Sequence, residues 1–155
     1  TIAWPTVTSG VMRILANRIA ITSADISTML KYITEVTFNE TPITTLSLAT
    51  HTATTQVDYF LAETSLTNVD FSVITNLVKF NDQTINLEDL GVNATQIDSL
   101  LAQFEGCSAG ESGGGDHTGR SLPMGGSIDP NATPGAAGLI SKANLIGKGY
   151  SVTTN

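Results

Sequence analysis

The chain has little charge and a single cysteine, and both scarcities exclude classes of protein. Charged residues make up 14% of its 155 residues, well below the roughly one quarter that is usual in globular proteins. Seven Lys and Arg stand against fourteen Asp and Glu, which gives a net charge of −7. Because so few scattered cations cannot displace phosphate counterions, we expect neither nucleic acid nor a membrane surface as a partner. The lone Cys107 excludes an internal disulfide.

Long apolar runs are absent as well, and the first residues do not predict a signal peptide. No apolar stretch approaches the roughly 18 residues that a membrane-spanning helix needs, and the opening TIAWPTVTSG has no charged or apolar region of a signal peptide. With 41% apolar residues, the chain can bury a substantial core, so we expect a single domain over residues 1–155. The Thr-, Ser- and Asn-rich remainder is common in secreted, virion and cell-surface proteins.

A repeated apolar spacing is present in the middle of the chain. Apolar residues recur at positions i, i+3 and i+5, which matches neither the period of a strand nor that of a helix. The copies begin at Ile33, Ile43, Leu66, Leu87 and, in part, Leu77. Their starts lie near multiples of about 11 residues, half of the leucine-rich period. Because one such coil cannot bury its own apolar edge, the spacing predicts a ladder of stacked coils over residues 33–92.

The predicted fold class is therefore α/β, a short leucine-rich-repeat-like β/α stack with helical caps at both ends. Residues 1–32 are predicted to form the N-terminal helical cap. Val11, Ile14 and Ile19 share one face of a helix there, and Ser23 or Thr22 can cap a second helix.

Residues 93–155 are predicted to form a C-terminal closing module. Its first helix begins at Thr95 as N-cap and carries Ile97, Leu100, Leu101 and Phe104. A glycine-rich loop follows at residues 106–121. Pro134 opens a second helix with apolar residues Leu139, Ile140, Leu145 and Ile146, which ends at Gly149. Tyr150, Val152 and Thr154 then alternate in a final strand.

This C-terminal segment resembles a known closing module. The resemblance is carried by ATQIDSLLAQF and by GRSLPMGGSIDPNATPGAAGLISKANLIGKGYSVTTN. It is similar to the end of leucine-rich-repeat-like proteins of gut-type bacteria and of fibre or other virion proteins of their phages. The family more often has Trp in place of Tyr150 and a far shorter loop than residues 109–118. The resemblance implies a structural and binding element in a virion, with no catalytic residues to carry over.

The candidate contact residues lie in and beside the glycine-rich loop: Asp116, His117 and Arg120. A hydrolase would need His117 and Cys107, or a loop serine, held rigidly within hydrogen-bond reach, and a glycine-rich loop without a G-x-S-x-G elbow does not favour that arrangement. The two histidines lack ligand spacing, and the acidic residues lack a calcium-loop pattern. We therefore expect no enzyme, no catalytic residues, no metal site and no cofactor.

The sequence favours a non-enzymatic structural or adhesive virion protein, such as a phage fibre, tail or head-decoration component. Its expected partners are other virion proteins or a host surface glycan or protein, and it is expected to be a homo-oligomer. A secreted bacterial surface adhesin of the same build, located outside the cell or on its surface, is the alternative. A hydrolase ranks below both.

Overall fold

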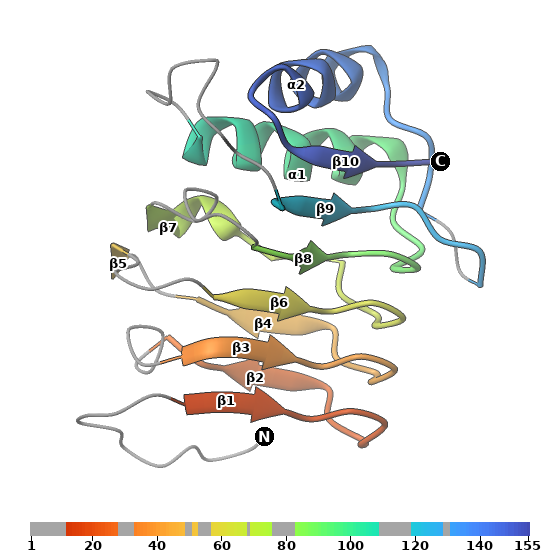
Figure 1. Ribbon diagram of the computed structural model, residues 1–155. Coiled ribbons are helices and arrows are strands. Elements are labelled where there is room, and N and C mark those ends of the chain that lie inside the picture. The colour runs from red at the N-terminus through yellow and green to blue at the C-terminus, as the bar shows by residue number, and fades with distance from the viewer. Residues whose placement is uncertain are drawn as a thin grey trace.

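In the residues that it describes, the computed structural model is a mixed α/β structure of short parallel strands and two α-helices (Figure 1). The structure describes residues 12–27, 33–48, 51–52, 57–67, 69–75, 83–108, 119–128 and 131–155.

The main row of strands is parallel and follows the order β1-β3-β6-β8. These strands are β1 (Met12–Leu15), β3 (Ile33–Thr37), β6 (Asp58–Phe60) and β8 (Ile85–Asn86). The parallel pair β9 (Ser121–Pro123) and β10 (Ser151–Thr153) continues this row beyond β8 in Figure 1. The connection is a parallel bridge between Thr84 and Ser121 and a 2.8 Å bond in which the Leu87 N–H donates to the Pro123 carbonyl.

Other strands form separate two-stranded parallel sheets. β2 (Ser23–Asp25) pairs with β4 (Thr45–Ser47), and β5 (His51–Thr52) pairs with β7 (Ile74–Thr75) directly after the 3₁₀ turn η2 (Phe71–Val73). Each pair joins segments 22 or 23 residues apart in sequence. Neighbouring segments therefore repeat the same path, one rung above the other.

A repeated turn follows the first four strands of the main row. In each turn one non-glycine residue has a left-handed backbone with φ of 55° or 56°: Arg18, Glu40, Glu63 and Asp89. The N–H of each donates to a carbonyl in the next rung at 3.1–3.2 Å. A left-handed non-glycine residue is costly by itself, so its recurrence at intervals of 22, 23 and 26 residues indicates that the ladder bonds hold the turn in place.

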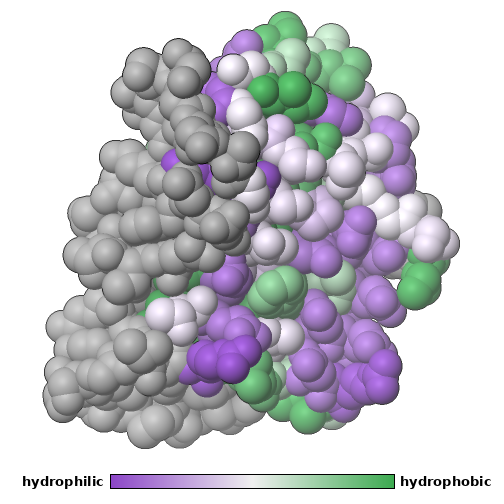
Figure 2. Space-filling view, in the orientation of Figure 1, coloured by the Kyte–Doolittle hydropathy of each residue, from purple (hydrophilic) through white to green (hydrophobic). Residues whose placement is uncertain are grey.

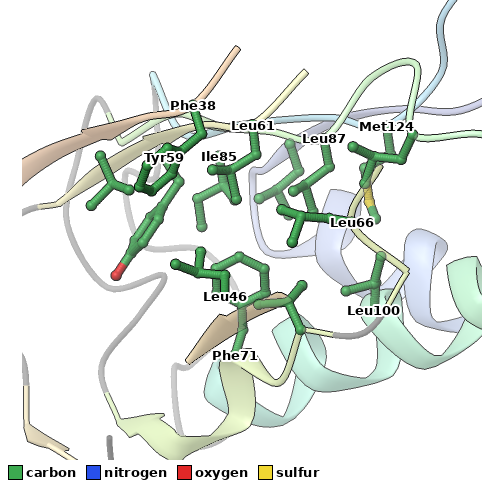
Figure 3. Close-up of a cluster of buried hydrophobic side chains, with 14 of the residues drawn as sticks. Phe38, Leu46, Tyr59, Leu61, Leu66, Phe71, Ile85, Leu87, Leu100 and Met124 are labelled. Atoms are coloured by element: carbon green, nitrogen blue, oxygen red, sulfur yellow. The ribbon is translucent and has the colours of Figure 1, made fainter. Parts of the chain in front are cut away.

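The interior is a single apolar cluster between the two sets of strands and the helices. Val36 and Leu46 from the rung of β3 and β4, Val69 from the next rung and Leu90 from the turn after β8 all belong to it and are each at most 9% exposed. Figure 3 shows the labelled side chains of this cluster pointing toward one another. At its centre, the rings of Tyr59 and Phe71 meet edge to face at 5.4 Å, and Phe104 from α1 adds a third ring at 5.3 Å from Phe71. The predicted common interior is therefore present.

The predicted N-terminal helical cap is wrong for residues 12–27, which form β1 and β2 and extend the ladder by a rung. Ile14 is buried as predicted, but Ile19 is 42% exposed because the left-handed turn at Arg18 separates the two. Pairing with β3 supplies the backbone bonds that a helix would otherwise supply. The rest of the predicted cap lies outside the described residues.

Two helices cover the C-terminal end of the strand rows in Figure 1: α1 (Ala94–Cys107) and α2 (Ala136–Gly147). Asn93, not Thr95, is the N-cap of α1, where it forms a capping box with Gln96. α1 includes Gly106 and Cys107, the first two residues of the predicted glycine-rich loop, so the helix extends further than predicted. No helix in the described ranges has the length and apolar character to span a bilayer.

Candidate functional site

The predicted contact residues do not form a described site. Asp116 and His117 lie outside the described residues. Arg120 is only 5% exposed; its guanidinium donates to the Tyr150 hydroxyl and lies over the Tyr150 ring, with Cζ 5.0 Å from the centroid. This placement ties the start of β9 to the start of β10, so Arg120 supports the closing pair from inside and does not offer its charge at the surface.

Cys107 has the environment of a structural thiol. It is half-buried at the end of α1, with its Sγ 3.9 Å from the Phe71 carbonyl. Burial, and secondly the Asp70 carboxylate, raise the pKa of the thiol, which disfavours the reactive thiolate. Over the ranges that the structure describes, no group of three or more His, Cys, Asp or Glu side chains is arranged to hold a metal ion.

A groove of about 160 Å³ lies where α1 meets the loop after β6. Its lining residues are Leu66, Thr67, Val69, Leu90, Val92, Gln96, Ser99, Leu100 and Gln103. The apolar members are buried and form its floor, while Thr67 and Ser99 are exposed at its edge. None of the nine side chains ionises at ordinary pH.

Two glutamines from α1 fix the geometry of this groove. Gln96 donates from Nε2 to the Thr67 carbonyl at 2.9 Å, and its Oε1 accepts the N–H of the N-cap Asn93 at 2.9 Å. Further along α1, the side-chain oxygen of Gln103 accepts a hydrogen bond from the Phe71 N–H at 2.9 Å. The two glutamines hold both ends of the loop against the helix, so the groove is preformed.

The chemistry of the groove suits a small neutral ligand. Its apolar floor can pack against an apolar face of a ligand, and its rim supplies hydroxyl and amide groups for hydrogen bonds. Neutral sugars likewise combine an apolar face with hydrogen-bonding groups. Sequence analysis missed this site, although Gln96, Ser99 and Gln103 are spaced i, i+3 and i+7 along one flank of the predicted helix. The opposing wall comes from residues about 30 positions earlier, which only the fold brings into contact.

Charged pairs lie along the outside of the N-terminal rungs. Arg13 bonds Glu35, and Arg18 bonds Glu40 with Nε 2.6 Å from a carboxylate oxygen. The bond from Arg18 lowers the pKa of the Glu40 carboxyl. Both arginines are exposed, so solvent screens each pair; the pairs align neighbouring rungs but contribute little to stability.

No family model, no curated protein and no solved structure matches this chain.

Proposed function

We propose that this chain is a non-enzymatic structural or adhesive domain of a virion protein, such as a phage fibre, tail or head-decoration component. In this proposal the strand rows form a short leucine-rich-repeat-like stack, which α1 and α2 close at its C-terminal end. The stack presents a rigid surface to a host glycan or protein, or to a neighbouring virion protein. The observation that carries the proposal is the left-handed turn that recurs in four successive rungs and is hydrogen-bonded from each rung to the next.

These bonds favour binding because they order the surface before a partner arrives. Each turn is held by the rung that follows it, so little conformational entropy is left to lose on contact. The groove supports binding over catalysis, since its lining residues include no acid, base or thiol. The virion setting is supported by the resemblance of residues 93–155 to the closing module described above.

The groove is the proposed contact for a neutral glycan. We expect the labelled protein to bind neutral glycans on an array, and to favour them over acidic ones because the chain carries a net charge of −7. Ser99→Arg fills the exposed edge with a long charged side chain and should abolish this binding. Ser127→Arg is the matched control, because Ser127 is also exposed but does not line the groove. Equal glycan binding by both variants, or none by the wild type, would contradict the assignment.

The setting is tested separately, by detecting the protein in purified virions and in cell-surface fractions of the source culture. Recovery in virions at a fixed copy number supports the proposal. Recovery only in the cell-surface fraction supports the alternative, a secreted bacterial leucine-rich-repeat adhesin. Hydrolysis of a bound glycan that is lost in Cys107→Ser would overturn the non-enzymatic assignment.

A further inference from the structure

The first rung, which consists of β1 and β2, has an outer edge at β1. β1 stands at the end of the row β1-β3-β6-β8, so among the described residues it has a strand neighbour on one side only. In Figure 1 it is the lowest strand of this row. Such an edge offers backbone groups with which another strand can pair.

The bonds between β1 and β3 identify the backbone groups at this edge. The Ala16 N–H donates to the Thr37 carbonyl at 2.8 Å, and two residues later the Arg18 N–H donates to the same neighbouring rung at 3.2 Å. Successive residues of a parallel strand bond to opposite sides. The carbonyls of Leu15 and Asn17 therefore point away from β3, toward the outer edge.

Two large apolar side chains are exposed in the same rung. Leu15 is 61% exposed and Ile19 42%. Their counterparts one rung further, Thr37 and Thr41, are 5% and 2% exposed. The inner pair has a rung on both sides, whereas the first pair has a described rung on one side only. Within the fold, these positions are covered by another rung, so a strand of the same kind fits the outer edge.

Two arginines of the first rung select the charge of such a strand. Arg13 bonds Glu35 and Arg18 bonds Glu40 in the rung behind, and the two arginine side chains are 60% and 76% exposed. Figure 2 shows hydrophilic side chains on the side of the lower rungs where Figure 1 places the turns after β1 and β3. A guanidinium has donors for more than one carboxylate. A carboxylate that approaches the edge meets the arginines first, whereas a cation there is repelled.

The third rung shows the spacing that an acidic strand needs. Asp58 lies in the same register column as Arg13, and Glu63 has the left-handed turn position that Arg18 has in the first rung. The two acids are five positions apart, as the two arginines are. A segment with acids at i and i+5 therefore places one carboxylate beside each arginine.

We infer that the β1 edge binds an acidic segment of a separate protein, which adds to it as a parallel strand. Carboxylates at i and i+5 of the segment face Arg13 and Arg18. Its N–H groups at i+3 and i+5 donate to the carbonyls of Leu15 and Asn17, and an apolar side chain at i+2 covers Leu15. The first eleven residues of this chain contain no Asp or Glu, so they do not supply these carboxylates. The inference does not depend on the groove or its ligand, so either can fail alone.

A peptide with the sequence of residues 57–67, VDYFLAETSLT, probes the edge because it has both acids and an apolar residue at i+2. In an NMR titration of the whole ¹⁵N-labelled chain, up to about 2 mM peptide, we expect the amide signals of residues 13–19 to move. The peptide with Asp58→Lys and Glu63→Lys should bind at least about tenfold more weakly, because two attractive contacts become repulsive. Binding that leaves residues 13–19 unmoved, equal binding of both peptides, or no binding overturns the inference. The chain is unchanged throughout, so misfolding cannot cause any of these results.

Methylation of one peptide nitrogen tests the strand geometry. In the fold, the Leu61 N–H donates to the following rung at 3.0 Å, whereas the Ala62 N–H donates backward to the Asn39 side chain. In the bound peptide the Leu61 N–H would face the Leu15 carbonyl, so N-methylation there should abolish the shifts. N-methylation of Ala62 is the matched control and should leave binding in place. An equal effect of the two methyl groups overturns strand addition.

A charge swap tests the register. Arg18→Glu should weaken binding of the unmodified peptide and should strengthen binding of the peptide with Glu63→Lys alone, since the new charges attract each other. Thermal unfolding verifies that this variant is folded. A folded Arg18→Glu chain that still prefers the unmodified peptide overturns the assignment of position i+5 to Arg18.

Discussion

Asn131 joins three segments of the fold from a fully buried position, which makes its removal the most demanding test of the packing. It is 2% exposed. Its Oδ1 accepts the N–H groups of Leu90 and Val92 at 3.1 and 3.3 Å, and its Nδ2 donates to the carbonyls of Leu87 and Met124 at 2.7 and 2.9 Å. One side chain thus satisfies four backbone groups of the turn after β8 and of the segment after β9.

The expected cost of Asn131→Ala follows from these four bonds. Each net bond is worth about 1 kcal/mol, and a buried backbone group left without a partner costs about 1–3 kcal/mol. Water that enters the vacated space recovers part of this loss, so we expect the free energy of unfolding to fall by about 4 kcal/mol. That is a large share of the roughly 5–15 kcal/mol that stabilises a domain. At neutral pH, Asn131→Asp should lower the free energy of unfolding at least as much as Asn131→Ala, because a carboxylate oxygen would then face two carbonyl oxygens.

Urea unfolding followed by circular dichroism measures this loss. The matched control is Asn17→Ala, at an exposed turn position, where we expect a change within about 0.5 kcal/mol. A loss below about 1 kcal/mol for Asn131→Ala would refute the reasoning, because it would mean that the four backbone groups find other partners without cost.

Three further predictions concern the helices. Gly138→Ala should lower the free energy of unfolding by about 1–2 kcal/mol, because the new methyl displaces Asp98 from the N-terminal end of α2. Gly147→Ala meets open space and should raise the free energy of unfolding by about 0.5–1 kcal/mol. Urea unfolding measures both changes, and two changes in the same direction would contradict the geometry. Hydrogen bonds from Ser141 and Asn144 hold the pKa of Glu105 below its ordinary 4.5, so the stabilisation is present above about pH 4.5 and is lost as the pH falls through the lower folded-state pKa. Glu105→Gln should therefore lower the melting temperature at pH 7 but not in strong acid, and a difference that persists in acid would contradict this origin. Asn93→Ala removes the N-cap of α1 and should cost about 1 kcal/mol by urea unfolding; a neutral result would mean that the capping box adds nothing to stability.

The elements that were predicted well are those whose signals are local. The apolar spacing of Ile97, Leu100 and Phe104 predicted α1, and Val152 between polar neighbours predicted the last strand. The cap was predicted two residues too late, although the sequence contains the pair that marks it, since Asn93 and Gln96 match a capping box.

The N-terminal region shows where local signals fail. Ile14 and Ile19 fit a helical face as well as they fit a strand followed by a turn, because the spacing of a few apolar residues is ambiguous. The choice was made by β3, which offers a parallel partner to the β1 backbone and an acidic partner, Glu35, to Arg13. Such a pairing joins residues more than 20 positions apart, so no short window of the sequence contains it.

The sequence by itself determined the two C-terminal helices and many of the residues that fill the interior, because each depends on apolar spacing within a few residues. Only the tertiary structure decided the orientation of α2 and the position of the groove. The sequence shows apolar residues all around α2, but the fit of Gly138 against Asp98 turns Leu139 and Ile140 to the surface. The groove requires α1 to meet a loop some 30 residues away, and such a contact is set by the packing of the whole chain.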